Sequence, residues 1–115
     1  MEIQERTFEF AIRIVKLCQY LDEKPGVERI LSNQLLRSGT SVGANIEEAQ
    51  AGQSRADFLS KMSIASKEAR ETLYWLKLLE KTELISIDRL QDLKQEADEI
   101  VRILTSIVKS TKQKS

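Results

Sequence analysis

Apolar residues recur along almost the whole chain at spacings of three and four, the spacing that places side chains on one face of an α-helix. Breaks in this pattern are few: the single proline, Pro25, precedes Gly26, and turn-forming residues gather again at 51–54 and 82–86. The segments between the breaks predict helices over residues 3–23, 27–50, 55–81 and 87–108, followed by a frayed tail at 109–115. The series predicts an all-α fold: an antiparallel, up-down four-helix bundle forming a single domain over residues 1–115.

The segment from Gln34 to Ala51 separates into two stripes when it is placed on a helix at about 100° per residue. The apolar stripe has Ser38 and Gly39 where a helical core would usually have a large side chain. The second stripe is polar and consists of Gln34, Arg37, Ser41, Asn45 and Glu48.

Because this polar stripe borders an apolar face, some of its groups should be partly buried and hydrogen bonded. We favour a structural network that ties the second helix to the third, with Glu68 or Glu71 facing Arg37. The alternative is a polar site for a ligand or a nucleic-acid phosphate.

Gly39 and Gly43 lie inside the second predicted helix, and each costs about 1 kcal/mol relative to alanine. Close approach of a neighbouring helix is the natural compensation. A break near Ser38–Thr40, with a new N-cap at Thr40 or Ser41, is the alternative. Both stripes keep their phase across the glycines, which favours one continuous helix.

The first and third helices carry more apolar surface than a four-helix monomer needs. Apolar positions in the first helix fill an arc of about 200°, and residues 73–79 of the third are apolar nearly all round. Large exposed apolar patches usually mark partners, so we expect a homo-oligomer with Tyr74, Trp75 and Leu78 near its interface, together with part of the first helix. A monomer whose long side chains cover these patches is the alternative.

The composition excludes several kinds of chemistry. The chain has no histidine, which removes Ser-His and Cys-His nucleophilic pairs, histidine acid–base catalysis and the commonest metal ligand. Neighbouring Ser60-Lys61 and Ser66-Lys67 point in different directions on a helix, so they do not form serine–lysine dyads. We therefore expect no enzyme activity, no catalytic residues, no metal or other cofactor, and no small-molecule substrate.

The chain also lacks the marks of export or membrane insertion. Its one cysteine, Cys18, lies in an apolar helical pattern and suits a reducing compartment. No signal peptide or membrane-spanning segment is readable, and the expected location is the cytoplasm.

The charges balance, at 18 basic and 18 acidic residues, which argues against a dedicated nucleic-acid binder at the level of one chain. Two segments are locally basic: residues 53–82, and the tail after Ile107, which has Lys109, Lys112 and Lys114 and no acid. The candidate nucleic-acid contacts of the third helix are Arg55, Lys61, Lys67, Arg70 and Lys77.

Two stretches, QLLRSGTSVGANIEEA and DFLSKMSIASKEARETLYWL, closely resemble a family of four-helix-bundle proteins known from reading frames inserted in bacterial 23S ribosomal RNA genes. These are the 23S rRNA intervening-sequence proteins. The matching residues are Gln34, Leu35, Arg37, Ser38, Ser41, Val42, Asn45, Ile46, Glu48, Phe58, Ala65, Glu68 and Glu71. One departure is Ala49, where the family usually has glycine, so Gly52 is expected to end the second helix instead.

The resemblance implies a homopentameric ring and kinship with the accessory proteins of diversity-generating retroelements, which bind nucleic acid through basic surfaces. The function expected from it is that of a non-enzymatic oligomeric protein that associates with RNA or nucleoprotein. The alternative is a protein–protein adaptor that docks a partner on the apolar surface around Trp75.

Overall fold

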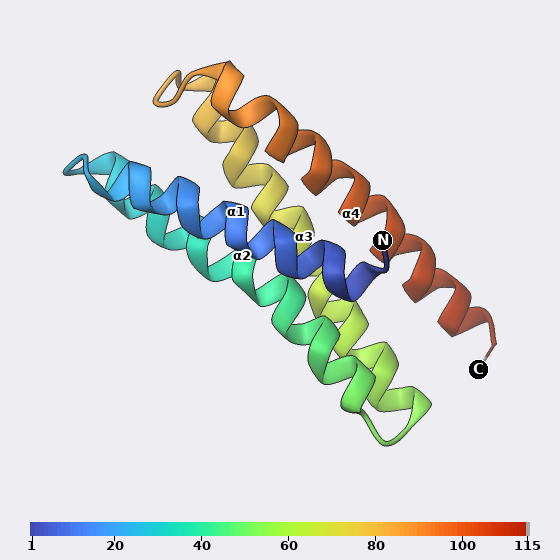
Figure 1. Ribbon diagram of the computed structural model, residues 1–115. Coiled ribbons are helices and arrows are strands. Elements are labelled where there is room, and N and C mark those ends of the chain that lie inside the picture. The colour runs from blue at the N-terminus through green and yellow to red at the C-terminus, as the bar shows by residue number, and fades with distance from the viewer. Residues whose placement is uncertain (115) are drawn as a thin grey trace.

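The computed structural model describes residues 1–114, and its secondary structure consists of four α-helices (Figure 1). They are α1 (Ile3–Asp22), α2 (Val27–Ala51), α3 (Arg55–Lys81) and α4 (Ile87–Gln113). Each helix packs against the next along the chain, and α1 also meets α4, which closes an up-down bundle of 46 × 22 × 20 Å. The all-α, up-down four-helix arrangement predicted from the sequence is therefore confirmed. Within the described residues, no helix carries an apolar stretch long enough to cross a membrane.

The helix boundaries follow local chemistry. Gly26 has a φ of 87°, a conformation that glycine adopts without steric cost, and it stands directly before α2. The Ser54 hydroxyl accepts a hydrogen bond from the Asp57 amide at 3.1 Å, so Ser54 is the N-cap of α3. Gly52 ends α2 as expected, but in extended backbone (φ −61°, ψ 148°) rather than the left-handed conformation of the usual glycine cap.

The end of α4 differs from the prediction. The helix continues to Gln113, whereas the sequence predicted fraying from residue 109. Ile107 and Val108 pack against the core, and the Thr111 hydroxyl donates to the Ile107 carbonyl at 2.8 Å. Arg55 at the start of α3 donates to the Lys114 carbonyl, so the last turn of α4 is held by a distant helix. This tertiary contact has no signature in the local pattern.

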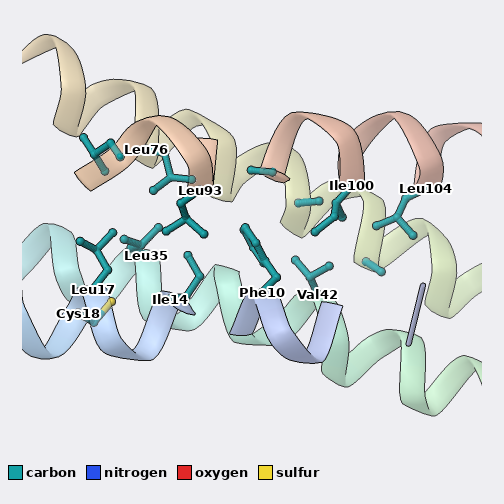
Figure 2. Packing of buried hydrophobic residues seen from close by; sticks show 14 of the residues in the cluster. Phe10, Ile14, Leu17, Cys18, Leu35, Val42, Leu76, Leu93, Ile100 and Leu104 are labelled. Atoms are coloured by element: carbon teal, nitrogen blue, oxygen red, sulfur yellow. The ribbon is translucent and has the colours of Figure 1, made fainter. Parts of the chain in front are cut away.

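The core is one continuous apolar layer between the helices (Figure 2). Its buried members in α4 repeat at three and four, as predicted: Leu90, Leu93, Ala97, Ile100 and Leu104. Near the C-terminus of α3, Leu76 and Leu79 are buried, whereas Phe58 and Leu73 in the same helix are only half-buried.

The glycines of α2 mark the closest approach of α1. A Cβ atom at Gly39 would lie 2.8 Å from Cγ2 of Ile14, and one at Gly43 would lie 3.3 Å from the Thr7 carbonyl oxygen. Helix α2 runs without a break through both positions. The predicted continuous helix and close helix approach are confirmed, and the alternative break near residues 38–40 does not occur.

Candidate functional site

Arg37 is the centre of a polar network between α2 and α3. Its guanidinium pairs with Glu68 (Nη1 to Oε2, 3.3 Å) and with Glu71. It also donates to Oε1 of Gln34 at 3.2 Å, and the Trp75 indole donates to the same Glu71 carboxylate at 3.0 Å. The predicted structural tie is confirmed, with both glutamates taking part.

Beneath this network lies a buried pair of hydroxyls. Thr72 Oγ1 donates to Oγ of Ser38 at 2.9 Å and lies 2.8 Å from the Glu68 carbonyl, and both side chains are fully buried. The pairing was not predicted, because Ser38 was interpreted only as a small core residue. The available signal was that both hydroxyl residues fall in the apolar phase of their helices.

The rest of the polar stripe does not join this network. Asn45 donates to the carbonyl and the hydroxyl of Ser41 at 2.9 and 3.0 Å, within α2. Glu48 is exposed and has no hydrogen-bond or ion-pair partner among residues 1–114. The stripe therefore consists of one interhelical tie and one local bond rather than a single ligand site.

The five candidate basic residues of α3 do not gather on one face. Arg55 is engaged with the Lys114 carbonyl. Lys61 and Arg70 are nine residues apart, which places them on opposite sides of a helix. Arg70 and Lys77 border hollows shared with α4. In the described part of the chain, Lys61, Lys67, Arg70 and Lys77 take part in no ion pair. Their role in nucleic-acid binding stays a prediction.

Large exposed apolar side chains occur on all four helices, and those of α1 and α3 concern the predicted interface. On α1, Phe8 is 62% exposed and borders a largely apolar hollow with Ala11, Gly43 and Ala44, and Val15 is exposed further along the same helix. On α3, Tyr74 is 58% exposed and meets Trp75 edge-to-face at 5.1 Å between ring centroids. Trp75 and Leu78 are half-buried. The assignment of Tyr74, Trp75 and Leu78 to an oligomer interface stays a prediction.

A second ion-pair cluster, which the sequence did not predict, joins α1 to α4. Arg6 donates to both carboxylate oxygens of Glu96, each at 2.8 Å, and to Glu99 at 2.6 Å. These bonds raise the pKa of the Arg6 guanidinium, and the Arg6 bond lowers the pKa of Glu99. In the same way the Lys94 ammonium, 2.8 Å away, lowers the pKa of Glu80 and joins α4 to α3.

Cys18 is buried where α1 meets α2. Burial raises the pKa of its thiol, which outweighs the opposite effect of the Ser32 side chain. The thiol donates to the Ser32 carbonyl at 3.4 Å. A thiol in this environment acts as a small apolar side chain. Within residues 1–114, no group of three or more Asp, Glu or Cys residues could hold a metal ion.

The geometry thus defines an up-down four-helix bundle whose antiparallel helices are tied by interhelical ion pairs and a buried hydroxyl pair. The chain belongs to the 23S rRNA-intervening sequence protein family, whose sequence pattern matches residues 1–106. The resemblance found in the sequence is confirmed.

A solved structure agrees with this assignment. The chain is similar to a protein of unknown function from the S23 ribosomal protein family of Bacteroides thetaiotaomicron VPI-5482, whose crystal structure was determined at 1.70 Å resolution. The two are 46% identical over 94% of this chain and 99% of that chain, with a TM-score of 0.86. A comparison with curated proteins finds no match.

Proposed function

We propose that this protein is a non-enzymatic, homo-oligomeric scaffold that associates with structured RNA in the cytoplasm. The observation that supports RNA association is that four cations of α3 have no acidic partner among the described residues. Lys61, Lys67, Arg70 and Lys77 form no ion pair within residues 1–114, although the chain has as many acids as bases. These charges remain available to an external polyanion such as an RNA backbone.

The exposed apolar surface of α1 supports self-association. Phe8 and Val15 are exposed on this helix, and Ala11 and Ala44 extend the apolar area towards α2. A closed assembly of identical subunits would cover this surface. A ring of five, which the family resemblance suggests, would also present five copies of the α3 cations and so strengthen the attraction for phosphate.

Sedimentation velocity of the purified protein, alone and with a dye-labelled RNA hairpin, tests both components. We expect the protein alone to sediment faster than a 13.2 kDa monomer. At low salt the RNA should co-sediment with it, and the complex should dissociate steeply as salt rises, because phosphate contacts release counterions. A wild-type protein that leaves the hairpin free at low salt would refute the RNA component, and a monomer would refute the scaffold.

A second candidate function is a protein–protein adaptor, favoured by the exposed Tyr74 ring beside Trp75. Trp75→Ala is a poor test, since it also removes the indole bond to Glu71. Tyr74→Ser removes an exposed ring that has no hydrogen bond among the described residues. In the adaptor, the Tyr74 surface docks a partner protein instead of a second subunit, so we expect this variant to lose partners in pull-downs while its oligomeric state is unchanged. Retention of every partner would count against the adaptor.

A further inference from the structure

A basic groove lies between the middle of α3 and the last turns of α4. Its volume is about 300 Å³. We define the groove by its lining residues: Ser66, Arg70, Thr105, Val108, Lys109 and Lys112. Three of these are cations from two helices, and none is a carboxylate. The groove is therefore locally positive, although the net charge of the whole chain is zero.

Ser66 marks this groove as more than a chance gathering of surface lysines. The chain buries five polar side chains within the described residues, and four of them are hydrogen bonded: Thr7, Ser32, Ser38 and Thr72. Ser66 is the fifth; only 5% of it is exposed, and its hydroxyl has no hydrogen-bond partner in residues 1–114. Among the described residues, no fully enclosed side-chain nitrogen or oxygen lacks a partner, so the Ser66 hydroxyl is not fully enclosed, and Ser66 lines the groove. It is a donor and acceptor held ready for a ligand.

The cations of the groove have no acidic partner among the described residues. Arg70, Lys109 and Lys112 take part in none of the ion pairs of the described chain. Lysines near a helix C-terminus do stabilise the helix dipole. At the end of α4, however, Arg55 already donates to the Lys114 carbonyl, and Arg70 belongs to the middle of α3. Stabilisation of the helix dipole therefore does not explain why three cations surround the Ser66 hydroxyl.

We propose that this groove binds consecutive phosphates of an RNA backbone. Arg70 presents a planar set of donors that suits phosphate oxygens, and Lys109 and Lys112 provide two further charges one helical turn apart on α4. Ser66 and Thr105 supply hydroxyls for the sugar–phosphate edge. The groove is concave and its only apolar lining residue is Val108, so it suits a strand of phosphates better than a flat lipid surface. The inference rests on the proposed RNA association and names its site.

The test compares two full-length variants that each lose three positive charges. The groove variant is Arg70→Gln/Lys109→Gln/Lys112→Gln. The matched control, Arg13→Gln/Lys16→Gln/Lys81→Gln, loses three exposed charges that neither line the groove nor belong to the candidate RNA contacts of α3. Affinity for a dye-labelled RNA hairpin is measured by fluorescence anisotropy from about 50 to about 300 mM salt, the range over which phosphate contacts are screened. Circular dichroism and sedimentation of both variants verify that fold and assembly are unchanged.

We expect the groove variant to bind roughly ten- to a hundredfold more weakly at low salt, and its salt slope to fall by about 2 to 3, the number of phosphate contacts removed. The control should lose much less. Ser66→Ala should weaken binding about threefold with little change in thermal stability, because its hydroxyl has no internal partner to lose.

Equal weakening of the two triple variants would overturn the groove while leaving RNA association intact, since net charge alone would then explain binding. A wild-type protein that binds no RNA would overturn both proposals. Binding to phosphatidylglycerol vesicles in place of RNA would also overturn the groove assignment and point to a membrane surface.

Discussion

At the scale of single residues, Gly39 decides how closely α1 and α2 pack. The absence of a side chain lets Ile14 lie where a Cβ atom would clash with two of its carbons, at 2.8 and 2.9 Å. Glycine within a helix costs about 1 kcal/mol relative to alanine. Ile14 is completely buried where the two helices cross, and its packing there offsets the helix-propensity cost of Gly39.

Gly39→Ala should therefore destabilise the protein, although alanine is the better helix former. Overpacking a core costs about 1–3 kcal/mol, and helix propensity returns about 1 kcal/mol, so we expect a net loss of up to about 2 kcal/mol in the free energy of unfolding. Urea denaturation measures the difference. Asn33→Ala, at an exposed position of the same helix, is the control and should be neutral or slightly stabilising. A Gly39→Ala variant as stable as wild type would show that α1 can shift without cost.

Cys18 gives a second prediction at this scale. Its thiol is buried and its pKa is raised, so the reactive thiolate is scarce and inaccessible in the folded protein. We expect a thiol reagent such as dithionitrobenzoate to label the native protein at least about a hundredfold more slowly than the urea-unfolded chain, in proportion to the rarity of opening. Rapid labelling of the native protein would contradict the burial of this residue.

At the scale of helices, the α1–α4 contact is the sparsest of the bundle, and the Arg6 cluster reinforces it. Bidentate guanidinium–carboxylate pairs are stronger and more directional than single ion pairs. Arg6 therefore fixes the position of α1 along a side of the bundle where the two helix backbones approach each other at few points.

Arg6→Gln should lower the midpoint of thermal unfolding by about 4 °C at neutral pH. This is the shift expected when a domain of this size loses about 1 kcal/mol of ion-pair stabilisation. The Lys16→Gln variant, which removes one charge from an exposed position of α1 that takes part in no ion pair of the described chain, is the control for general charge effects. An unchanged midpoint for Arg6→Gln would show that α1 is held by packing alone.

The same cluster predicts a dependence on pH. Bonding to Arg6 lowers the pKa of Glu99 in the folded protein, so its contribution to stability is fully present above the unfolded value of about 4.3 and is lost as pH falls through the lower folded value. The stability difference between wild type and Arg6→Gln should be constant from about pH 6 to 8 and should shrink below about pH 4.3. Urea denaturation at a series of pH values measures it, and a difference that persists at pH 3 would contradict the assignment.

The sequence predicted the helices well because their apolar spacing is local. It also predicted the Arg37 tie, because an antiparallel α2–α3 hairpin must bring Arg37 near Glu68 and Glu71. It missed features that depend on distant parts of the chain: Arg6 and Glu96 are 90 residues apart, and Arg55 reaches the far end of α4. The groove was hidden for the same reason, since Arg70 and the tail lysines belong to different helices.

At the scale of the whole molecule, the α1 surface around Phe8 is the surface that we propose a second subunit covers. Phe8 is 62% exposed, and beside it lies a hollow lined by small residues of α2. A large ring next to small side chains suits an interface in which a second copy fills the hollow.

Phe8→Glu should dissociate the proposed oligomer while each subunit remains folded. Burying an unpaired carboxylate in place of an aromatic ring should weaken association by about 2 kcal/mol or more at each interface. Sedimentation velocity measures the shift towards monomer, and circular dichroism measures the helix content. Arg13→Gln changes the net charge equally at an exposed position of α1 and should keep the wild-type assembly. An unchanged sedimentation coefficient for Phe8→Glu would place the interface elsewhere.

The order of helix contacts also bears on how the chain acquires its structure. Helices α1, α2, α3 and α4 each pack on the next, so three of the four helix pairs form between neighbours in sequence, and only α1 with α4 joins the two ends. Such low contact order is typical of domains that fold in microseconds to milliseconds. The pairing of α1 with α4 spans the greatest length of chain, so it should form last. Truncation of a residue in that seam should accordingly speed unfolding and leave the folding rate almost unchanged.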